Sequence, residues 1–245
     1  MPVKEFVLLL FTFLFISCGG AKVTPQNPED ENKQNELLDS DSLEVADNNI
    51  EITENSKLVV TLEAKLEKKY RDMKLSDEIN ELLVSHHIDF NIPEGFKLKD
   101  FSSNSVWDYD LSIIAESSNV EIRFKIMDDE PEYFKDNKGD SIDPSKAVSN
   151  ELMALLMKLN GGSLIADMQQ HPEIEAKTRF NAACYSTASF EPAAEFATYE
   201  IGSAGIFYKE GHGRVIVISL INGFNIPQSR TEWSGGSTAM RFVEP

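Results

Sequence analysis

The chain has 245 residues, which is enough for one well-packed domain together with additional segments. Its formal net charge of −18 at pH 7 repels phosphate groups, so we expect no nucleic-acid partner. Hydrophobic residues make up 41%, slightly less than in an average globular protein, which indicates that part of the chain lies outside the core. Its 2 cysteines are too few for a disulfide framework.

The N-terminal residues predict a signal peptide over 1–17. Lys4 precedes an almost wholly apolar run, residues 6–16. This run is shorter than the roughly 20 residues that a membrane-spanning helix needs, but it matches the apolar region of a secretory signal peptide. The run is followed by Ser17 and then Cys18, which places a small residue directly before a cysteine.

The stretch LFISCGG, residues 14–20, resembles the lipobox of bacterial lipoproteins. In that family the signal peptide is cleaved before the cysteine, whose thiol carries a diacylglyceryl group and whose amino group is usually acylated, with palmitate as a typical chain. The resemblance implies that Cys18 is the lipidation site, and two or three acyl chains give stable anchoring. The alternative is an ordinary signal peptide with an incidental cysteine.

The residue after the cysteine bears on localisation. Position 19 is glycine, not aspartate. By resemblance to the sorting rules of enteric bacteria, this implies an outer-membrane lipoprotein. Whether it faces the periplasm or the cell surface stays open.

Residues 18–56 predict an acidic, disordered linker. Carboxylates far outnumber lysines there, and the segment has no aromatic residue. Such a segment buries too little apolar surface to offset the entropy lost on ordering. We expect a spacer that its own charge keeps extended.

Residues 57–87 predict a helical segment in two pieces. Leu58, Leu62, Leu66 and Met73 fall on one stripe, and Ser76 is placed to cap the second helix. A separate stalk and a helix packed on the domain both fit this pattern.

Residues 88–245 predict an α+β domain in which helices cover an antiparallel sheet. Residues 109–116 and 120–126 form a hairpin with one charged, solvent-facing side, and 228–236 form a loop. Asp143 and Pro144 open an amphipathic helix that ends near Gly161. The remaining predicted elements are a strand at 88–92, a short helix at 172–180, strands at 183–190, 200–209 and 214–220, and an apolar segment at 240–243.

This element order, with IPEGFK at 92–97 and FYKEGHGRVIVISL at 207–220, resembles the PsbP-like α/β/α sandwich. That fold includes photosystem II accessory proteins, a Ran-binding nuclear import factor and bacterial lipoproteins. The resemblance covers about residues 88–242 and implies a role in binding partners or stabilising assemblies. It carries over no catalytic residue, since fold likeness alone does not establish function.

Two groups of residues have side chains that bind metals. His86 and His87 are adjacent, so their side chains diverge and need further ligands, for which His171 and His212 are distant in sequence. The oxygen-rich loop 128–143 contains Asp128, Asp129, Glu130, Asp136, Asn137, Asp140 and Asp143. Its spacing does not match the calcium-binding loop of EF-hands. We therefore expect no metal site.

No nucleophile has its catalytic partners in the sequence. Cys184 lies in a predicted strand, where a buried, unreactive thiol is expected. Ser203 is flanked by Gly202 and Ala204, which does not match the nucleophile elbow. The pairs Gly161–Gly162 and Gly235–Gly236 lack a phosphate-binding pattern. Trp107, Tyr109 and Trp233 lie in or beside loops, where they cap the core or form a binding patch.

Together these features predict a lipid-anchored cell-envelope protein that acts as a binding or assembly-accessory module. Its partners would be the membrane, through Cys18, and an envelope protein. We expect no enzymatic activity and no cofactor. The alternatives are a metal-assisted hydrolase, and a small-ligand carrier, which would need a sizeable apolar cavity between sheet and helices.

Overall fold

The structure is a computed structural model that describes residues 44–99, 106–136, 138–163 and 168–244, with side chains described from residue 56 onward. The chain divides into the units Met1–Glu44 and Val45–Pro245, and the second contains the domain. The predicted signal peptide, Cys18 and the linker up to residue 43 lie outside the described residues. Among the helices described, none is both long and apolar enough to cross a membrane.

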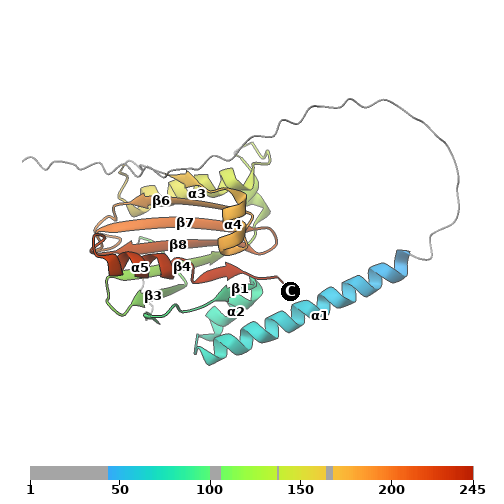
Figure 1. Cartoon of the computed structure of the whole chain (residues 1–245). Helices are drawn as coiled ribbons and strands as arrows, with labels where there is room; N and C mark the ends of the chain where they lie inside the picture. Colours follow the sequence, from blue (N-terminus) through green and yellow to red (C-terminus); the bar gives the residue numbers. More distant parts are fainter. Residues whose placement is uncertain (1–43, 100–105, 137, 164–167, 245) are drawn as a thin grey trace, which may run out of the picture. The chain divides into compact units, whose positions relative to one another are not determined.

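The domain is α+β, and a seven-stranded antiparallel sheet forms its centre (Figure 1). In sheet order the strands are β2 (Phe96–Leu98), β3 (Leu111–Ala115), β4 (Val120–Met127), β8 (Gly213–Ile221), β7 (Ile201–Lys209), β6 (Cys184–Phe190) and β5 (Gln169–Gln170). The long strands β7 and β8 are joined by the predicted turn, in which Gly211 and Gly213 have positive φ angles. The predicted hairpin and the three later strands are confirmed.

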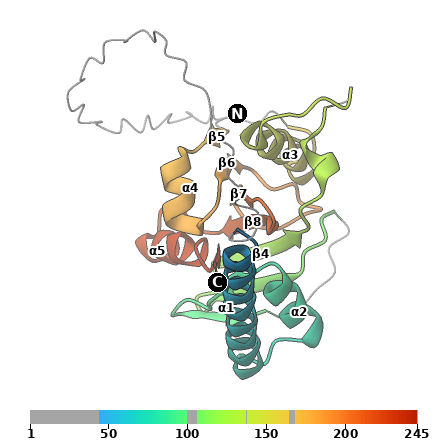
Figure 2. The same ribbon diagram turned by 90° about the vertical axis from the view of Figure 1, so that its right-hand side faces the viewer.

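Both faces of the sheet are covered, so the domain has three layers with two separate cores. Figure 2 shows α3 (Pro144–Leu159) on one side of the sheet and α4 (Glu173–Phe180) and α5 (Pro227–Gly236) on the other. The α4–α5 side also holds a small sheet of β1 (Ile88–Phe90) and β9 (Met240–Phe242). Alternate residues of each strand supply the two cores, as a two-residue side-chain period requires.

The helical segment packs on the domain through its second half. Helices α1 (Glu44–Asp72) and α2 (Asp77–Ser85) are separated by a short turn, and Ser76 caps α2 as predicted. Leu66, Tyr70 and Leu83 are buried in the core on the α4–α5 side. The Tyr70 hydroxyl donates a hydrogen bond to the Ile88 carbonyl and accepts one from the Phe90 amide, which joins α1 to β1. Helix α1 begins inside the stretch that the sequence assigned to the linker.

Four local features differ from the sequence prediction. Residues 227–236, expected to be mainly loop, form helix α5, whose sequence PQSRTEWSGG has no apolar stripe. Pro227 suits its first turn, and Gly236 allows it to approach the sheet closely. The short strands β2 and β5 and the 3₁₀ turn η1 (Pro131–Phe134) were not predicted, because elements of two to four residues have little periodicity.

Candidate functional site

A cavity of about 440 Å³ lies on the α4–α5 side of the sheet, over strands β6, β7 and β8. In Figure 1 these two helices lie on the same face of the sheet and leave part of β7 uncovered between them. We call this space the α4–α5 cavity. Its lining residues are Gln169, His171, Arg179, Phe180, Tyr185, Thr187, Ala188, Ser189, Ser203, Gly205, Val217, Ser219, Trp233, Ser234 and Ser237.

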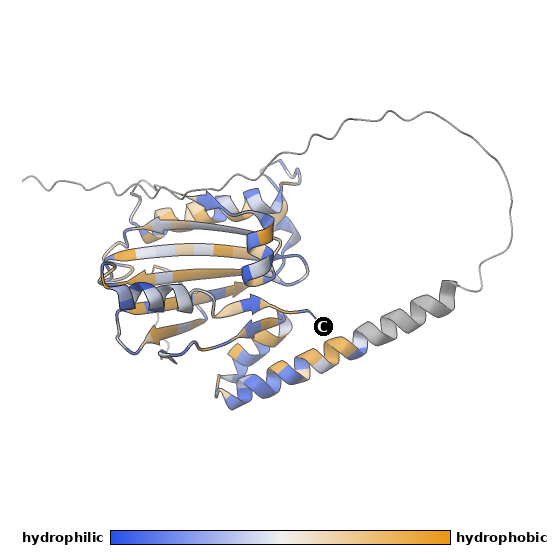
Figure 3. Ribbon diagram, viewed as in Figure 1, coloured by the Kyte–Doolittle hydropathy of each residue, from blue (hydrophilic) through white to orange (hydrophobic). Residues whose placement is uncertain are grey.

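The floor of the cavity is hollow because small residues occupy the middle of the sheet face. On β7 the residues facing this side are Ile201, Ser203, Gly205 and Phe207, so large side chains occur only at the ends. Figure 3 shows the same pattern as a pale middle of β7 between hydrophobic ends. With neither α4 nor α5 filling this middle, the space stays open.

Three serines form a row across the floor. Ser189 of β6 pairs in register with Ser203 of β7, which pairs with Ser219 of β8. Neighbouring strands lie about 4.8 Å apart, so the three side chains follow one another across the sheet on one face. No hydrogen bond among the described residues involves the side chain of Ser203 or Ser219, although Ser219 is only 3% exposed.

The wall on the α4 side is an ordered polar chain. One oxygen of Glu175 lies 3.1 Å from His171 Nδ1, and its other oxygen accepts a hydrogen bond from Arg179 Nη1 at 3.2 Å. His171 Nε2 lies 2.8 Å from the Thr187 hydroxyl on the floor. Burial raises the pKa of Glu175, but the neighbouring His171 and the hydrogen bond from Arg179 outweigh it and hold that pKa below its ordinary value.

Aromatic rings hold this wall in place. Tyr185 stacks on His171 with ring centroids 4.5 Å apart, and the Arg179 guanidinium lies over the rings of Phe180 and Tyr185. Burial raises the pKa of the Tyr185 hydroxyl to about 12, so this group is protonated at neutral pH. The wall therefore presents fixed groups to the cavity.

The opposite wall comes from α5, which contributes Trp233, Ser234 and Ser237. This helix lies close to the sheet at Gly236, where a Cβ atom would come within 2.6 Å of Ile122 Cδ1. The indole Nε1 of Trp233 is buried and has no hydrogen-bond partner among the described residues. A buried donor of this kind is unusual and calls for a partner.

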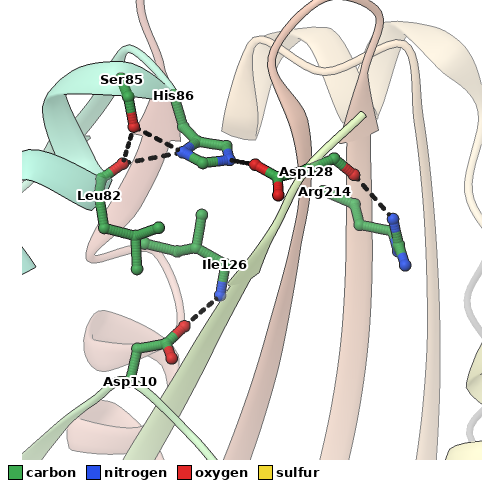
Figure 4. Close-up of polar contacts among 7 residues, drawn as sticks. All are labelled: Leu82, Ser85, His86, Asp110, Ile126, Asp128 and Arg214. Carbon is green, nitrogen blue, oxygen red and sulfur yellow. Dashed lines mark hydrogen bonds and ion pairs between the residues drawn. The ribbon is translucent and has the colours of Figure 1, made fainter. Parts of the chain in front are cut away.

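The two adjacent histidines contact different partners. Figure 4 shows His86 Nδ1 against the Leu82 carbonyl and the Ser85 hydroxyl, and its Nε2 pointing to Asp128. The distance from Nε2 to Asp128 Oδ1 is 3.1 Å. His87 instead lies 3.4 Å from His212 Nε2, a contact that the sequence did not reveal. The described residues contain no group of three or more His, Cys, Asp or Glu side chains that could hold a metal ion.

Carboxylates of the acidic loop accept hydrogen bonds from nearby protein groups. Asp129 accepts hydrogen bonds from the Tyr208 hydroxyl and the Gly211 amide, and Asp136 accepts from the amides of Lys138 and Asp140. Asp143 caps α3 as predicted, by accepting from the Ser145 amide. Asn137 lies outside the described residues. None of these residues lines the α4–α5 cavity.

The five other candidates from the sequence lie in different parts of the fold. Cys184 is buried, and burial raises the pKa of its thiol to about 11, which fits the expected unreactive group. Trp107 and Tyr109 are buried in the core under α3. Of the three aromatic candidates, Trp233 alone lines the cavity, together with Ser203 on its floor.

The charged side of the β3–β4 hairpin, predicted to face solvent, is buried in part. Glu121 is 0% exposed and accepts hydrogen bonds from Arg123, Lys99 and Tyr199. Burial raises the pKa of Glu121, but its cationic partners lower it below the ordinary value. Alternating charges fit an exposed strand face, so their burial near Tyr199 could not be predicted from the sequence.

The comparisons with known proteins leave the function open. No protein-family model matches the chain, and no curated protein matches its sequence. Among solved structures, the chain is similar to cyanobacterial PsbP (CyanoP) from Synechocystis sp. PCC 6803 in solution, with 11% identity and a TM-score of 0.41. The match covers 64% of this chain and 88% of that chain. At this distance it transfers no residue role to the chain.

Proposed function

We propose that this chain is a lipid-anchored cell-envelope protein whose α+β domain is a binding module with the α4–α5 cavity as its binding site. The anchor part rests on the lipobox-like stretch at residues 14–20 and the cysteine at position 18. The binding part rests on one observation, the preformed cavity of about 440 Å³ with polar groups on its floor and walls. Preformed cavities of this size are the usual sites of small ligands.

The cavity favours a small ligand over a protein as the direct occupant. Its walls are the helices α4 and α5, and its floor is a serine row on three strands. A protein partner would need a broader surface, because specific interfaces bury about 800 Å² on each side. An accessory role in an envelope assembly would then depend on the bound ligand.

A hydrolase is the second candidate, and one observation favours it. Glu175, His171 and Thr187 are connected in the order of an acid–base–nucleophile triad, at 3.1 and 2.8 Å. However, Thr187 lies within strand β6, where its neighbours pair with β7, so the backbone offers no free amide pair for an oxyanion. Binding is therefore the better-supported function.

The binding site is tested by native mass spectrometry of the lipidated protein purified from its own membranes. The variant Ser203→Leu places a larger apolar side chain on the cavity floor and serves as the comparison. We expect a bound small molecule on the wild type and none on the variant. If the wild type carries no added mass, or if the variant carries the same one, the α4–α5 cavity is not the binding site.

The hydrolase candidate has its own test. Thr187→Val removes the hydroxyl and keeps the shape of the side chain. If the domain is a binding module, the wild type should hydrolyse p-nitrophenyl acetate no faster than the Thr187→Val variant does. Hydrolysis that depends on both Thr187 and His171 would replace binding with catalysis as the function of the cavity.

The anchor is tested separately with Cys18→Ala. We expect the wild type in the outer-membrane fraction with a palmitate-labelled N-terminus, and the variant without the label. An unlabelled wild type, cleaved at another position, would show that the N-terminal stretch is an ordinary signal peptide.

A further inference from the structure

We propose that the α4–α5 cavity binds a neutral, hydroxyl-rich ligand, namely a saccharide. This inference rests on the proposed function, because it specifies the ligand class of the same site. It is carried by the kind of polar group in the cavity, by the balance of charge in its wall and by the unpartnered indole of Trp233.

Most polar groups that line the cavity are hydroxyls. They belong to Thr187, Ser189, Ser203 and Ser219 on the floor and to two serines of α5, Ser234 and Ser237. A hydroxyl both donates and accepts hydrogen bonds and rotates to suit its partner. Sugar hydroxyls have the same dual capacity, so a hydroxyl-lined floor matches them in any orientation of the ring.

Ser219 is the strongest sign of a missing partner on the floor. It is almost fully buried, lies at the β8 end of the serine row, and makes no side-chain hydrogen bond among the described residues. Val217 lies two residues before Ser219 on the same face of β8 and shows that an apolar residue fits there. Because Ser219 lines the cavity and has no protein partner there, its hydroxyl is free to donate to or accept from a ligand hydroxyl.

The charge of the cavity favours a neutral ligand. Arg179 donates a hydrogen bond to Glu175, and His171 Nδ1 lies 3.1 Å from the same carboxylate, so the guanidinium of the wall is already paired. No carboxylate belongs to the described residues that line the cavity, although the chain carries 41 acidic residues. An anionic ligand would compete with Glu175 for Arg179, whereas a neutral ligand leaves that pair intact.

Trp233 supplies the remaining surface. An indole ring presents a large apolar area and one N–H donor, a combination that suits the C–H face and the hydroxyls of a sugar ring. The Trp233 Nε1 is buried without a partner among the described residues. The site thus has a hydroxyl row on its floor and, on one wall, an aromatic residue with an unpartnered donor.

The test is saturation-transfer difference NMR on the lipidated full chain, in a detergent without a sugar head group. The probes are trisaccharides of glucose, mannose, galactose and N-acetylglucosamine, with sodium phosphate as the anionic probe. We expect at least one trisaccharide to bind, and Ser219→Ala to weaken its affinity about tenfold, which is the loss of about 1.4 kcal/mol. The matched control is Ser112→Ala, another buried strand serine outside the cavity.

Three results would overturn the saccharide proposal. The first is that no trisaccharide binds. The second is that Ser219→Ala binds the trisaccharide as tightly as the Ser112→Ala control does. The third is that phosphate binds to the wild type and does not bind to Arg179→Gln. Each of these leaves the proposed binding function standing if native mass spectrometry still finds a ligand that Ser203→Leu excludes. An empty wild-type cavity in that experiment would end both proposals.

Discussion

His87, between α2 and β1, lies 3.4 Å from His212, in the turn between β7 and β8, although 125 positions separate them. His87 Nε2 also lies 3.5 Å from Glu63 of α1, so this contact joins the N-terminal helices to the central sheet. The rings meet edge to face, with centroids 5.2 Å apart. Two imidazoles this close cannot both take up a proton without repulsion.

Acid should therefore weaken the fold at this contact. Burial lowers the pKa of His212 below its ordinary value, and Lys209 and His87 lower it further, against the Glu210 carbonyl and Glu244, which raise it. The unfolded chain then binds the proton more tightly, so stability is lost as the pH falls below about 6.5. Urea unfolding at pH 7.5 and 5.5 should show a larger loss for the wild type than for His212→Gln. Equal losses would contradict this assignment.

Gly236 should tolerate no side chain. A Cβ atom at this position would lie 2.6 Å from Ile122 Cδ1 and 2.9 Å from Phe96 Cζ. We expect Gly236→Ala to lower the free energy of unfolding by about 1–3 kcal/mol through overpacking. Gly235→Ala is the matched control, because its Cβ would meet nothing within 4 Å. Urea denaturation of both variants measures the difference, and equal stabilities would argue against the close packing of α5.

Breaking the buried charge cluster should be costly. Glu121 bonds Arg123, Lys99 and Tyr199, so Glu121→Leu leaves the buried Arg123 without its carboxylate. We expect a loss of about 3–5 kcal/mol in the free energy of unfolding. Adding Arg123→Met to that variant should recover much of the loss, whereas Glu132→Leu, at an exposed position, should have little effect. A Glu121→Leu protein as stable as the wild type would refute the account.

The attachment of α1 should depend on Tyr70. Its hydroxyl forms hydrogen bonds with both the Ile88 carbonyl and the Phe90 amide. Substitution by Phe keeps the ring and removes both hydrogen bonds. Tyr70→Phe should lower the free energy of unfolding by about 1–3 kcal/mol and speed proteolysis within α1. Lys69→Ala removes the neighbouring, partly exposed ion pair with Asp89 and should cost at most about 1 kcal/mol. Equal cleavage rates for the two variants would contradict the role of Tyr70.

The sequence predicted the elements with strong local signals. Asp143 and Pro144 mark the start of α3, and the clean alternation of apolar and charged residues marks β4. It did not predict α5, because PQSRTEWSGG has neither an apolar stripe nor strong helix formers, and its helical form depends on packing against the sheet. Local composition predicts secondary structure poorly where tertiary contacts determine it.

The candidate site could not be predicted from the sequence, for a related reason. Ser189, Ser203 and Ser219 are ordinary serines along the chain and become a row only through the register of three strands. The expected small-ligand cavity was apolar, whereas the floor observed is rich in hydroxyls. The one available signal was the run of small residues in IGSAG on β7, which leaves that face hollow.

The most direct test of the central claim is hydrogen–deuterium exchange of the lipidated protein, with and without an extract of its own envelope. If the α4–α5 cavity is the binding site, peptides from β6, β7, β8 and α5 gain protection in the wild type and gain none in Ser203→Leu. Protection confined to the α3 side, or the same protection in both proteins, would contradict the claim.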